Sequence, residues 1–395
     1  MAIRVLNNIV TEASNALMRI SQGSKLAKSL LCIAFIIAVR ISSKIPALVS
    51  YIRTNCPLKL KCVPRLPTFH DKVNYIAASV FEQFSRQTQI KNFSFFMPAL
   101  LPSFLMLYAG APPELKASFD QEFGLNQEGK SDDLHHDCAQ WLQSLSNHRS
   151  GEPTMMMGQA VALKQGLALR GDVADTYRTY NAETISFETL NEAETLGNDW
   201  VKQKTDGVIQ DLVHIDNPAI TLMLLTAAIF NGTWLYPFDL SKTQKKIFNN
   251  GDGSKVSMDQ MHASSDKYRT GLLGSSIRVL EVPFQGSIDM LIFLPNTENP
   301  QECNACLSKE MVPDNVMGFL KEPLSLQEER SLEIAIPKLN LKHETNLVED
   351  LGSWKLIQKI KRTDFRSSFL DQLIPDAILV DKMAMQTNIT LGEKG

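Results

Sequence analysis

The sequence is poor in the residues and motifs that stabilise small disulfide-rich or metal-binding proteins. It contains 6 Cys and 7 His in 395 residues, and the cysteines have no regular spacing. No His-Glu-x-x-His segment places two metal ligands on one face of a helix. These shortages exclude a disulfide scaffold and a common type of zinc hydrolase. The sequence therefore predicts no metal site and no cofactor.

Motifs for nucleophilic catalysis and nucleotide binding are also lacking. The chain has no Gly-x-Ser-x-Gly elbow, no Gly-x-x-x-x-Gly-Lys loop and no Gly-x-Gly-x-x-Gly fingerprint. Cys303 and Cys306 have the spacing of a redox pair or half a metal site, but two further ligands at matching spacing are absent. We interpret them as two ordinary thiols. The sequence predicts that the protein is not an enzyme.

Charge divides the chain into two parts. Residues 1–70 contain ten Lys or Arg residues and one acidic residue, Glu12, whereas residues 71–395 contain 30 basic and 42 acidic residues. The larger part therefore carries a net charge of −12 and has no basic stripe. Because nucleic-acid binding depends on clustered Lys and Arg, we exclude nucleic acid as a partner.

The basic extension, residues 1–70, has three recognisable segments. Apolar residues spaced three and four apart over residues 3–20 predict an amphipathic helix. The apolar run at residues 30–39 is flanked by Lys28 and Arg40 and is too short to span a bilayer. Prolines at positions 57, 64 and 67 indicate a linker into the domain at residues 71–395.

Three interpretations of the basic extension remain open. It is a signal or anchor that stays uncleaved, or it serves membrane-surface contact through residues 1–52 or organelle targeting, or it is an extension without a specific role. The first places the protein outside the cell or in the secretory pathway. The second makes it intracellular, membrane-associated or organelle-targeted.

Helices precede strands in residues 71–395. Apolar periodicity predicts helices over residues 71–88, 93–111, 133–147 and 192–213. Residues 219–230 form an apolar run that predicts a central strand covered on both faces. Shorter β-type runs lie at residues 277–282, 288–294 and 332–336. This order predicts an α+β domain.

Eight segments in this domain together resemble the serpins, a large family of serine-protease inhibitors. In chain order they are Asn92-Phe-Ser-Phe-Phe-Met-Pro98, Leu105-Met-Leu-Tyr-Ala-Gly-Ala111, the stretch from Asn198 to Leu212, Thr226-Ala-Ala-Ile-Phe-Asn-Gly-Thr-Trp234, Pro237-Phe238, Val279-Leu-Glu-Val-Pro-Phe284, Met290-Leu-Ile-Phe-Leu-Pro295 and Ile336-Pro-Lys-Leu339. The resemblance runs from about residue 71 to the last residue. It implies three β-sheets surrounded by about eight or nine helices, with residues 219–230 as a central strand of the largest sheet.

The resemblance also implies a mechanism. Serpins are suicide substrates: a protease cleaves an exposed reactive loop, and the loop inserts into the large sheet as a new strand. The expected activity is inhibition of a serine-type endopeptidase, and the expected partner is a serine or cysteine protease.

Glu393, Lys394 and Gly395 resemble the start of the hinge that precedes the reactive loop. We expect the loop and the closing strands after Gly395 to be missing from this chain. The alternative is therefore a non-inhibitory, degenerate serpin-like protein that accepts a strand or peptide partner at the large sheet.

Two groups of candidate site residues follow from the resemblance. Met97, Leu100, Thr226 and Met385 occupy the shutter-like positions where serpins typically have two Ser, one Asn and one His. This group is almost entirely apolar, which indicates either altered loop insertion or compensated core packing.

The second group is breach-like, at the top of the sheet. There Glu393 and Lys338 are expected to form an ion pair beside Trp234, closing the end of the sheet. Three Asn-x-Ser/Thr sequons, at Asn92, Asn231 and Asn388, are candidate glycosylation sites.

Overall fold

A computed structural model describes residues 66, 68–86, 93–125, 131–146, 154–215, 219–249, 254–265, 268–286, 288–297, 299–321, 327–328, 332–372, 374, 376–380 and 383–395. The amphipathic helix and the apolar run expected in the basic extension lie outside these residues. Of the helices that are described, none is both long enough and apolar enough to cross a membrane.

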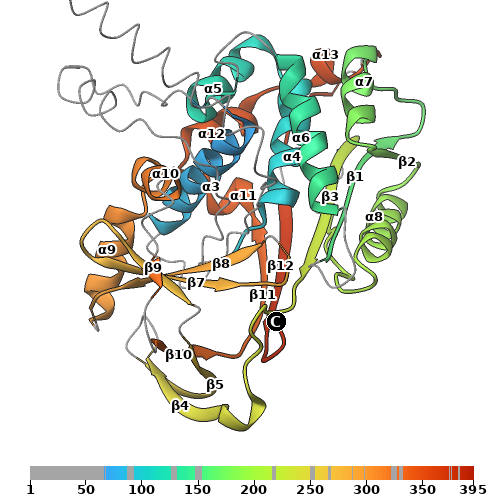
Figure 1. Cartoon of the computed structure of the whole chain (residues 1–395). Helices are drawn as coiled ribbons and strands as arrows, with labels where there is room; N and C mark the ends of the chain where they lie inside the picture. The colour runs from blue at the N-terminus through green and yellow to red at the C-terminus, as the bar shows by residue number, and fades with distance from the viewer. Residues whose placement is uncertain are drawn as a thin grey trace, which may run out of the picture.

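Helices dominate the first half of the described chain (Figure 1). They are α3 (Phe69–Ser85), α4 (Met97–Ala109), α5 (Pro113–Phe123), α6 (Ser131–Ser146), α7 (Gly171–Thr179) and α8 (Leu190–Lys204). The helix expected over residues 71–88 is α3, which begins two residues earlier than the boundary placed at residue 71. Thr68 and Asp71 form a capping box that fixes this start, because each side chain accepts from the other residue's backbone N–H.

Helix α4 is buried along almost its whole length, as its apolar sequence predicts. It starts at Met97, four residues after the expected start, because the preceding residue, Phe96, is extended and Pro98 occupies the first turn. It ends at Ala109 with Gly110 as its C-cap, and the Phe369 ring packs so closely there that a Cβ on Gly110 would clash with it. A glycine is therefore required at this position.

Helix α8 is shorter than predicted. The helix expected over residues 192–213 ends at Lys204, because Asp206 and Gly207 adopt positive φ angles of 47° and 79°. The chain then returns beside the helix, and the Asn198 side-chain carbonyl accepts the backbone N–H groups of residues 212 and 213. Val208, an apolar residue within the range of the expected helix, is 50% exposed.

Twelve strands are described, in four hydrogen-bonded groups. The first group has the order β2-β1-β3, with β1 (Thr154–Lys164), β2 (Glu183–Phe187) and β3 (Leu222–Asn231). The second pairs β11 (Leu339–Asn346) with β12 (Ala384–Leu391). The third is β10-β5-β4, with β4 (Gln244–Asn249), β5 (Lys255–Ser265) and β10 (Leu332–Pro337). The fourth is β8-β7-β6-β9, with β6 (Arg269–Leu273), β7 (Ile277–Pro283), β8 (Asp289–Pro295) and β9 (Gln327–Glu328).

The remaining helices are α9 (Pro300–Glu310), α10 (Pro313–Lys321), α11 (Leu347–Asp350), α12 (Lys355–Arg362) and α13 (Arg366–Phe369), with the 3-10 turn η1 (Leu240–Lys242). The described residues thus contain eleven α-helices rather than eight or nine, and two of these, α11 and α13, are single turns of four residues. The mixed architecture confirms the predicted α+β fold.

Side chains alternate across the sheet that contains β3. Leu225 and Ala227 pack with Trp200 and Val201 of α8 on one face. Thr226, between them, points to the opposite face, where the Ser103 side chain of α4 hydrogen-bonds to it. The sheet is therefore enclosed between α8 and α4.

The prediction that residues 219–230 form a doubly covered central strand is wrong in one respect. One edge of β3 pairs antiparallel with β1, but no described strand is hydrogen-bonded to the other edge. Most β3 side chains are only half-buried as a result. The free edge faces β12, and the candidate site lies between these two strands.

Candidate functional site

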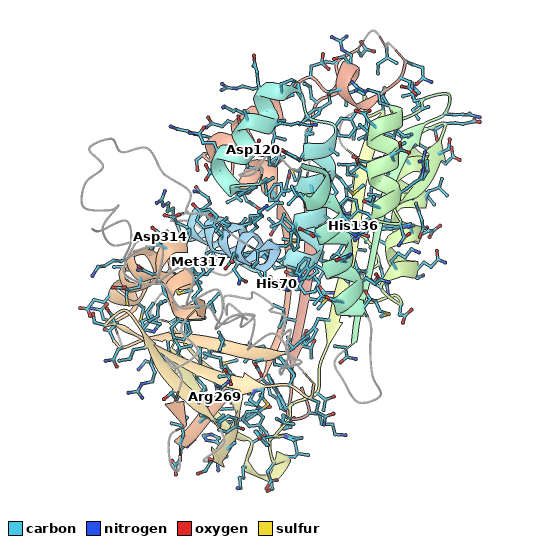
Figure 2. The ribbon with its side chains drawn as sticks, turned by 45° about the horizontal axis from the view of Figure 1, so that its top comes forward. His70, Asp120, His136, Arg269, Asp314 and Met317 are labelled. Atoms are coloured by element: carbon cyan, nitrogen blue, oxygen red, sulfur yellow. The ribbon has the colours of Figure 1, made fainter. Side chains whose placement is uncertain are left out.

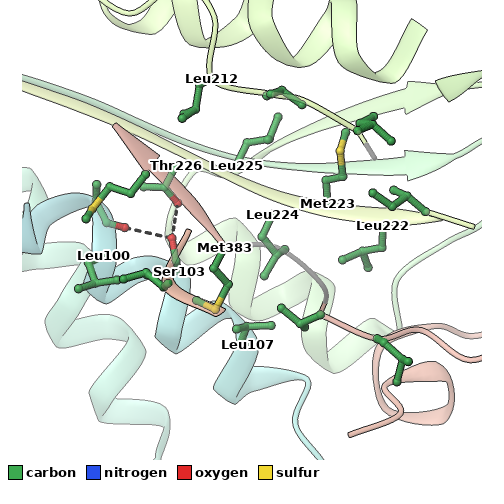
Figure 3. Close-up of a pocket in the computed structure, with 18 of the residues that line it drawn as sticks. Leu100, Ser103, Leu107, Leu212, Leu222, Met223, Leu224, Leu225, Thr226 and Met383 are labelled. Atoms are coloured by element: carbon green, nitrogen blue, oxygen red, sulfur yellow. Dashed lines mark hydrogen bonds between the residues drawn. The ribbon is translucent and has the colours of Figure 1, made fainter. Parts of the chain in front are cut away.

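A slot separates β3 from β12, and its two edges consist of unpaired backbone. In the described part of the chain, no backbone hydrogen bond joins these strands. A first cavity of about 150 Å³ lies in the slot between residues 222–226 of β3 and Met383 and Met385. Its floor includes the α4 side chains Leu100, Ser103 and Leu107 (Figure 3).

A second cavity of about 100 Å³ continues the slot. It lies between residues 228–231 of β3 and residues 387–391 of β12. Residue numbers on both strands rise from the first cavity to the second, so β3 and β12 run parallel. A segment that runs antiparallel to both could pair with both free edges at once.

The structure brings three of the four shutter-like residues together. Leu100, Thr226 and Met385 line the first cavity. Met97 is buried at the start of α4 but does not line either cavity. The apolar character expected at these positions gives the slot an apolar wall.

Ser103 was not identified from the sequence, yet it is the α4 side chain that contacts β3 through a hydrogen bond. Its Oγ lies 2.9 Å from the Thr226 hydroxyl and 3.1 Å from the Ala99 carbonyl oxygen. Ser103 follows Leu100 by three residues, so both lie on one face of the helix. This three-residue spacing was the feature of the sequence that could have identified Ser103 as a neighbour of Leu100.

A second polar cluster, formed by Ser94, His343, Thr345 and Thr387, was also missed. The hydroxyls of Ser94 and Thr387 are hydrogen-bonded, and Nδ1 of His343 accepts the Ser94 backbone N–H at 3.3 Å. The Thr345 hydroxyl lies 2.9 Å from the same nitrogen. We call this group the Ser94 cluster. It joins the segment before α4 to β11 and β12, and it lies beside the second cavity because Ser94 and Thr387 line that cavity.

An ion pair lies at the end of the slot where β12 ends (Figure 1). Nζ of Lys338 is 2.7 Å from Oε1 of Glu393, and the Thr243 hydroxyl donates to the same oxygen at 2.8 Å. The Glu393 side chain is only 14% exposed. These two donors, first the Lys338 ammonium and then the Thr243 hydroxyl, hold the pKa of Glu393 below its usual value.

Trp234 holds the hinge-like residues at this end. Its indole is fully buried and stacks on the Phe284 ring, with a centroid distance of 4.3 Å. The indole N–H donates to the Gly392 carbonyl at 2.9 Å, and the backbone N–H donates to the Lys394 carbonyl at 2.8 Å. Gly395 has a φ of 141° and lies too close to the Gly232 carbonyl to accept a Cβ.

Two of the three sequons flank the second cavity. Asn231 ends β3 and Asn388 lies on β12, and both are exposed residues that line the cavity from opposite strands. The Asn388 side-chain amide donates to the Val208 carbonyl at 3.3 Å. Asn92 lies outside the described residues.

Among the described residues, we find no group of titratable side chains arranged as a catalytic centre. Figure 2 shows labelled histidine, aspartate and arginine side chains that come from α3, α5, α6, α10 and β6. Within the described ranges, no group of three His, Cys, Asp or Glu side chains could hold a metal ion. Cys303 and Cys306 donate to different carbonyls, and burial raises the pKa of the Cys303 thiol.

Comparison with known proteins identifies the family. The family model for the serpins, the serine protease inhibitors, matches residues 71–395. The chain belongs to the serpin family. Serpins are protease inhibitors rather than enzymes, in agreement with the prediction from the sequence.

Among curated serpins, the chain is 28% identical to mouse (Mus musculus) alpha-2-antiplasmin over 66% of its own length and 52% of that protein. It therefore spans about half the length of this relative. It is 24% identical to horse (Equus caballus) alpha-1-antiproteinase 2 over 86% of this chain and 77% of the relative. The solved structure of a cleaved Serpin 42Da matches with a TM-score of 0.71 and 21% identity, covering 83% of this chain and 87% of that one. This likeness supports the serpin fold.

Proposed function

We propose that this serpin inhibits a serine-type endopeptidase by accepting an extended segment into the slot between β3 and β12. One observation carries the proposal: the facing edges of two parallel strands are both free, and cavities extend between them along most of β3. The hinge-like residues 393–395 lie at the end of the same slot where β12 ends, so a segment that continues from them could enter it.

Strand acceptance would release free energy for physical reasons. The new strand would pair with both free edges, and each net backbone hydrogen bond contributes about 0.5–1.5 kcal/mol. Every second side chain of the strand would cover the α4 residues Leu100 and Leu107, which line the open cavity. An unfilled slot therefore represents a state that a strand can stabilise.

The proposed partner is a serine or cysteine protease, met outside the cell or in the secretory pathway. Plasmin is a reasonable first candidate because the mouse relative is named an antiplasmin. The test is to incubate the protein from its natural source, with any segment that continues from Gly395, with active plasmin and with active-site-blocked plasmin, then to denature the mixture. The proposal expects a denaturation-resistant complex with active plasmin alone. Absence of such a complex with plasmin and with a panel of serine and cysteine proteases would contradict it.

A second candidate function is strand binding without inhibition. The free edges of β3 and β12 favour it, because they can pair with a strand supplied by another polypeptide. Stable uptake of an external peptide, together with no protease complex, would support this function over inhibition.

A further inference from the structure

Strand β4 is an edge strand that is open to further pairing. It is the last strand in the order β10-β5-β4, and Figure 1 shows it at the outer margin of this sheet. All six of its residues pair with β5, and no other residue of the described chain forms a backbone hydrogen bond with it. Neighbouring residues of a strand direct their backbone groups to opposite edges, so half of the β4 N–H and C=O groups point outward. Another strand can be added here by pairing with these groups.

Apolar side chains are exposed on both faces of the sheet beside this edge. Ile247 is 61% exposed, Phe248 is 38% exposed, and Val256, which lies opposite Phe248 on β5, is 42% exposed. Because side chains alternate along a strand, Ile247 and Phe248 lie on opposite faces. An added strand would therefore cover apolar surface on both faces of the sheet as well as the free backbone groups.

Two exposed lysines, Lys245 and Lys246, directly precede the apolar pair on β4. Asp259 lies opposite Lys245 on β5, but no ion pair joins them, and in the described part of the chain neither lysine lies within ion-pair distance of an acidic side chain. The alternation of the strand places Lys245 with Ile247 on one face and Lys246 with Phe248 on the other. Each face of the edge thus presents one unpaired cation followed by one exposed apolar side chain.

The lysines select the kind of strand that fits this edge. A second copy of the chain would bring its own Lys245 and Lys246, so four lysines would share one short ladder, and lysines on an edge strand disfavour such pairing between copies. A strand with two acidic residues would instead place opposite charges beside these lysines. If it runs antiparallel to β4, as β5 does, its sequence reads apolar-apolar-acidic-acidic from the N-terminus.

We infer that the free edge of β4 is a docking site for an extended acidic segment of another protein, which pairs antiparallel with this strand. The two acidic residues of the segment contact Lys245 and Lys246, and its two apolar residues pack on Ile247 and Phe248. This site is separate from the slot between β3 and β12. The inference therefore goes beyond the proposed function and does not depend on it.

The test uses three fluorescently labelled peptides that are titrated against the full chain and followed by anisotropy. The matched peptide is Ser-Thr-Val-Val-Glu-Glu-Thr-Ser. A second peptide, Ser-Thr-Val-Glu-Val-Glu-Thr-Ser, has the same composition and charge in a mismatched order, and a third has Lys in place of both Glu residues. The matched peptide should bind saturably and about fivefold more tightly than either of the others. Equal binding of the two acidic peptides, or no saturable binding of the matched peptide up to its solubility limit, would overturn the inference.

Charge exchange tests the assigned contact. Lys246→Glu should weaken the matched peptide about fivefold and strengthen the Lys peptide by a similar factor. Lys361→Glu, at an exposed position of α12, makes the same change in net charge and should alter neither affinity. Both lysines are exposed, so the variants should keep the melting temperature of the wild type within about 2 °C. Equal weakening of the matched peptide by both substitutions would show attraction to the overall charge alone and would overturn the site.

Hydrogen exchange locates the bound peptide. The outward-facing amides of β4 should become protected in the complex, and the amides on the facing edges of β3 and β12 should not change. Protection of β3 and β12 instead would support strand acceptance in the slot and overturn this inference. Binding that leaves the β4 amides unprotected would contradict strand pairing. A dimer of the free chain in sedimentation that protects the same β4 amides would assign the edge to a second copy and would contradict an acidic partner.

Discussion

Lys338 and Glu393 form an ion pair of 2.7 Å that joins the end of β12 to the junction between β10 and β11. Thr243 donates to the same carboxylate, and the neighbouring residue, Gly392, accepts from the Trp234 indole. The hinge-like residues are therefore held by side chains from three separate segments. This arrangement closes one end of the slot, while the facing edges of β3 and β12 along the rest of the slot remain free.

Loss of the Glu393 charge should loosen this end of the slot. In Glu393→Gln the amide retains a weaker contact with Lys338 but loses the ion pair, so we expect a lower melting temperature at pH 7 and faster uptake of a strand peptide. Lys394→Gln is the control, because Lys394 is exposed and makes no ion pair in the described structure. Equal effects of the two substitutions would contradict a specific role for Glu393.

The same carboxylate predicts a pH dependence. Its pKa is lower in the folded state than in the unfolded chain, so it contributes stability above the unfolded value. That contribution is lost as the pH falls from about 5 through the lower folded pKa. The melting temperature of the wild type should therefore converge on that of Glu393→Gln as the pH falls. A constant difference across this range, measured by calorimetry, would contradict the prediction.

Trp234→Phe should weaken both stability and hinge attachment. The smaller ring leaves a cavity and removes the donor to the Gly392 carbonyl, so we expect a loss of about 2–3 kcal/mol in the free energy of unfolding, measured in urea. Trp200→Phe is the control: it removes a similar bond, to Glu183, from a site on α8. Both variants should lose stability, but only Trp234→Phe should accelerate peptide uptake. Acceleration by both would show a general effect of lower stability.

The Ser94 cluster should contribute to stability as a buried polar group. Ser94→Ala removes the partner of the Thr387 hydroxyl, and the expected loss in free energy of unfolding is about 1–2 kcal/mol. Ser144→Ala, at an exposed hydroxyl on α6, should change stability by less than about 0.5 kcal/mol. Similar values for both would show that the cluster does not anchor β12.

Sequence patterns predicted features that depend on local chemistry. Apolar periodicity identified α3, and short β-type runs identified β7, β8 and β10, because side-chain spacing and turn residues define such elements. The early end of α8 was missed because it depends on Asn198, which binds backbone groups of residues 212 and 213 only after the chain reverses.

Long-range features of the site were harder to predict. Ser94 and Thr387 are 293 positions apart, and no local pattern pairs them. The free edge of β3 was likewise not evident, because a strand that is paired on both edges and a strand with one free edge can have the same apolar sequence. In contrast, the resemblance to serpins placed Lys338 beside Glu393, and the structure contains this ion pair.

Hydrogen exchange with and without a strand peptide tests the central claim most directly. The peptide has ten alternating Val and Thr residues, the length of β3. The account predicts that one peptide binds per chain and that amides on the facing edges of β3 and β12 become strongly protected. A bound peptide that leaves these amides unprotected, or no binding at all, would contradict strand acceptance in the slot.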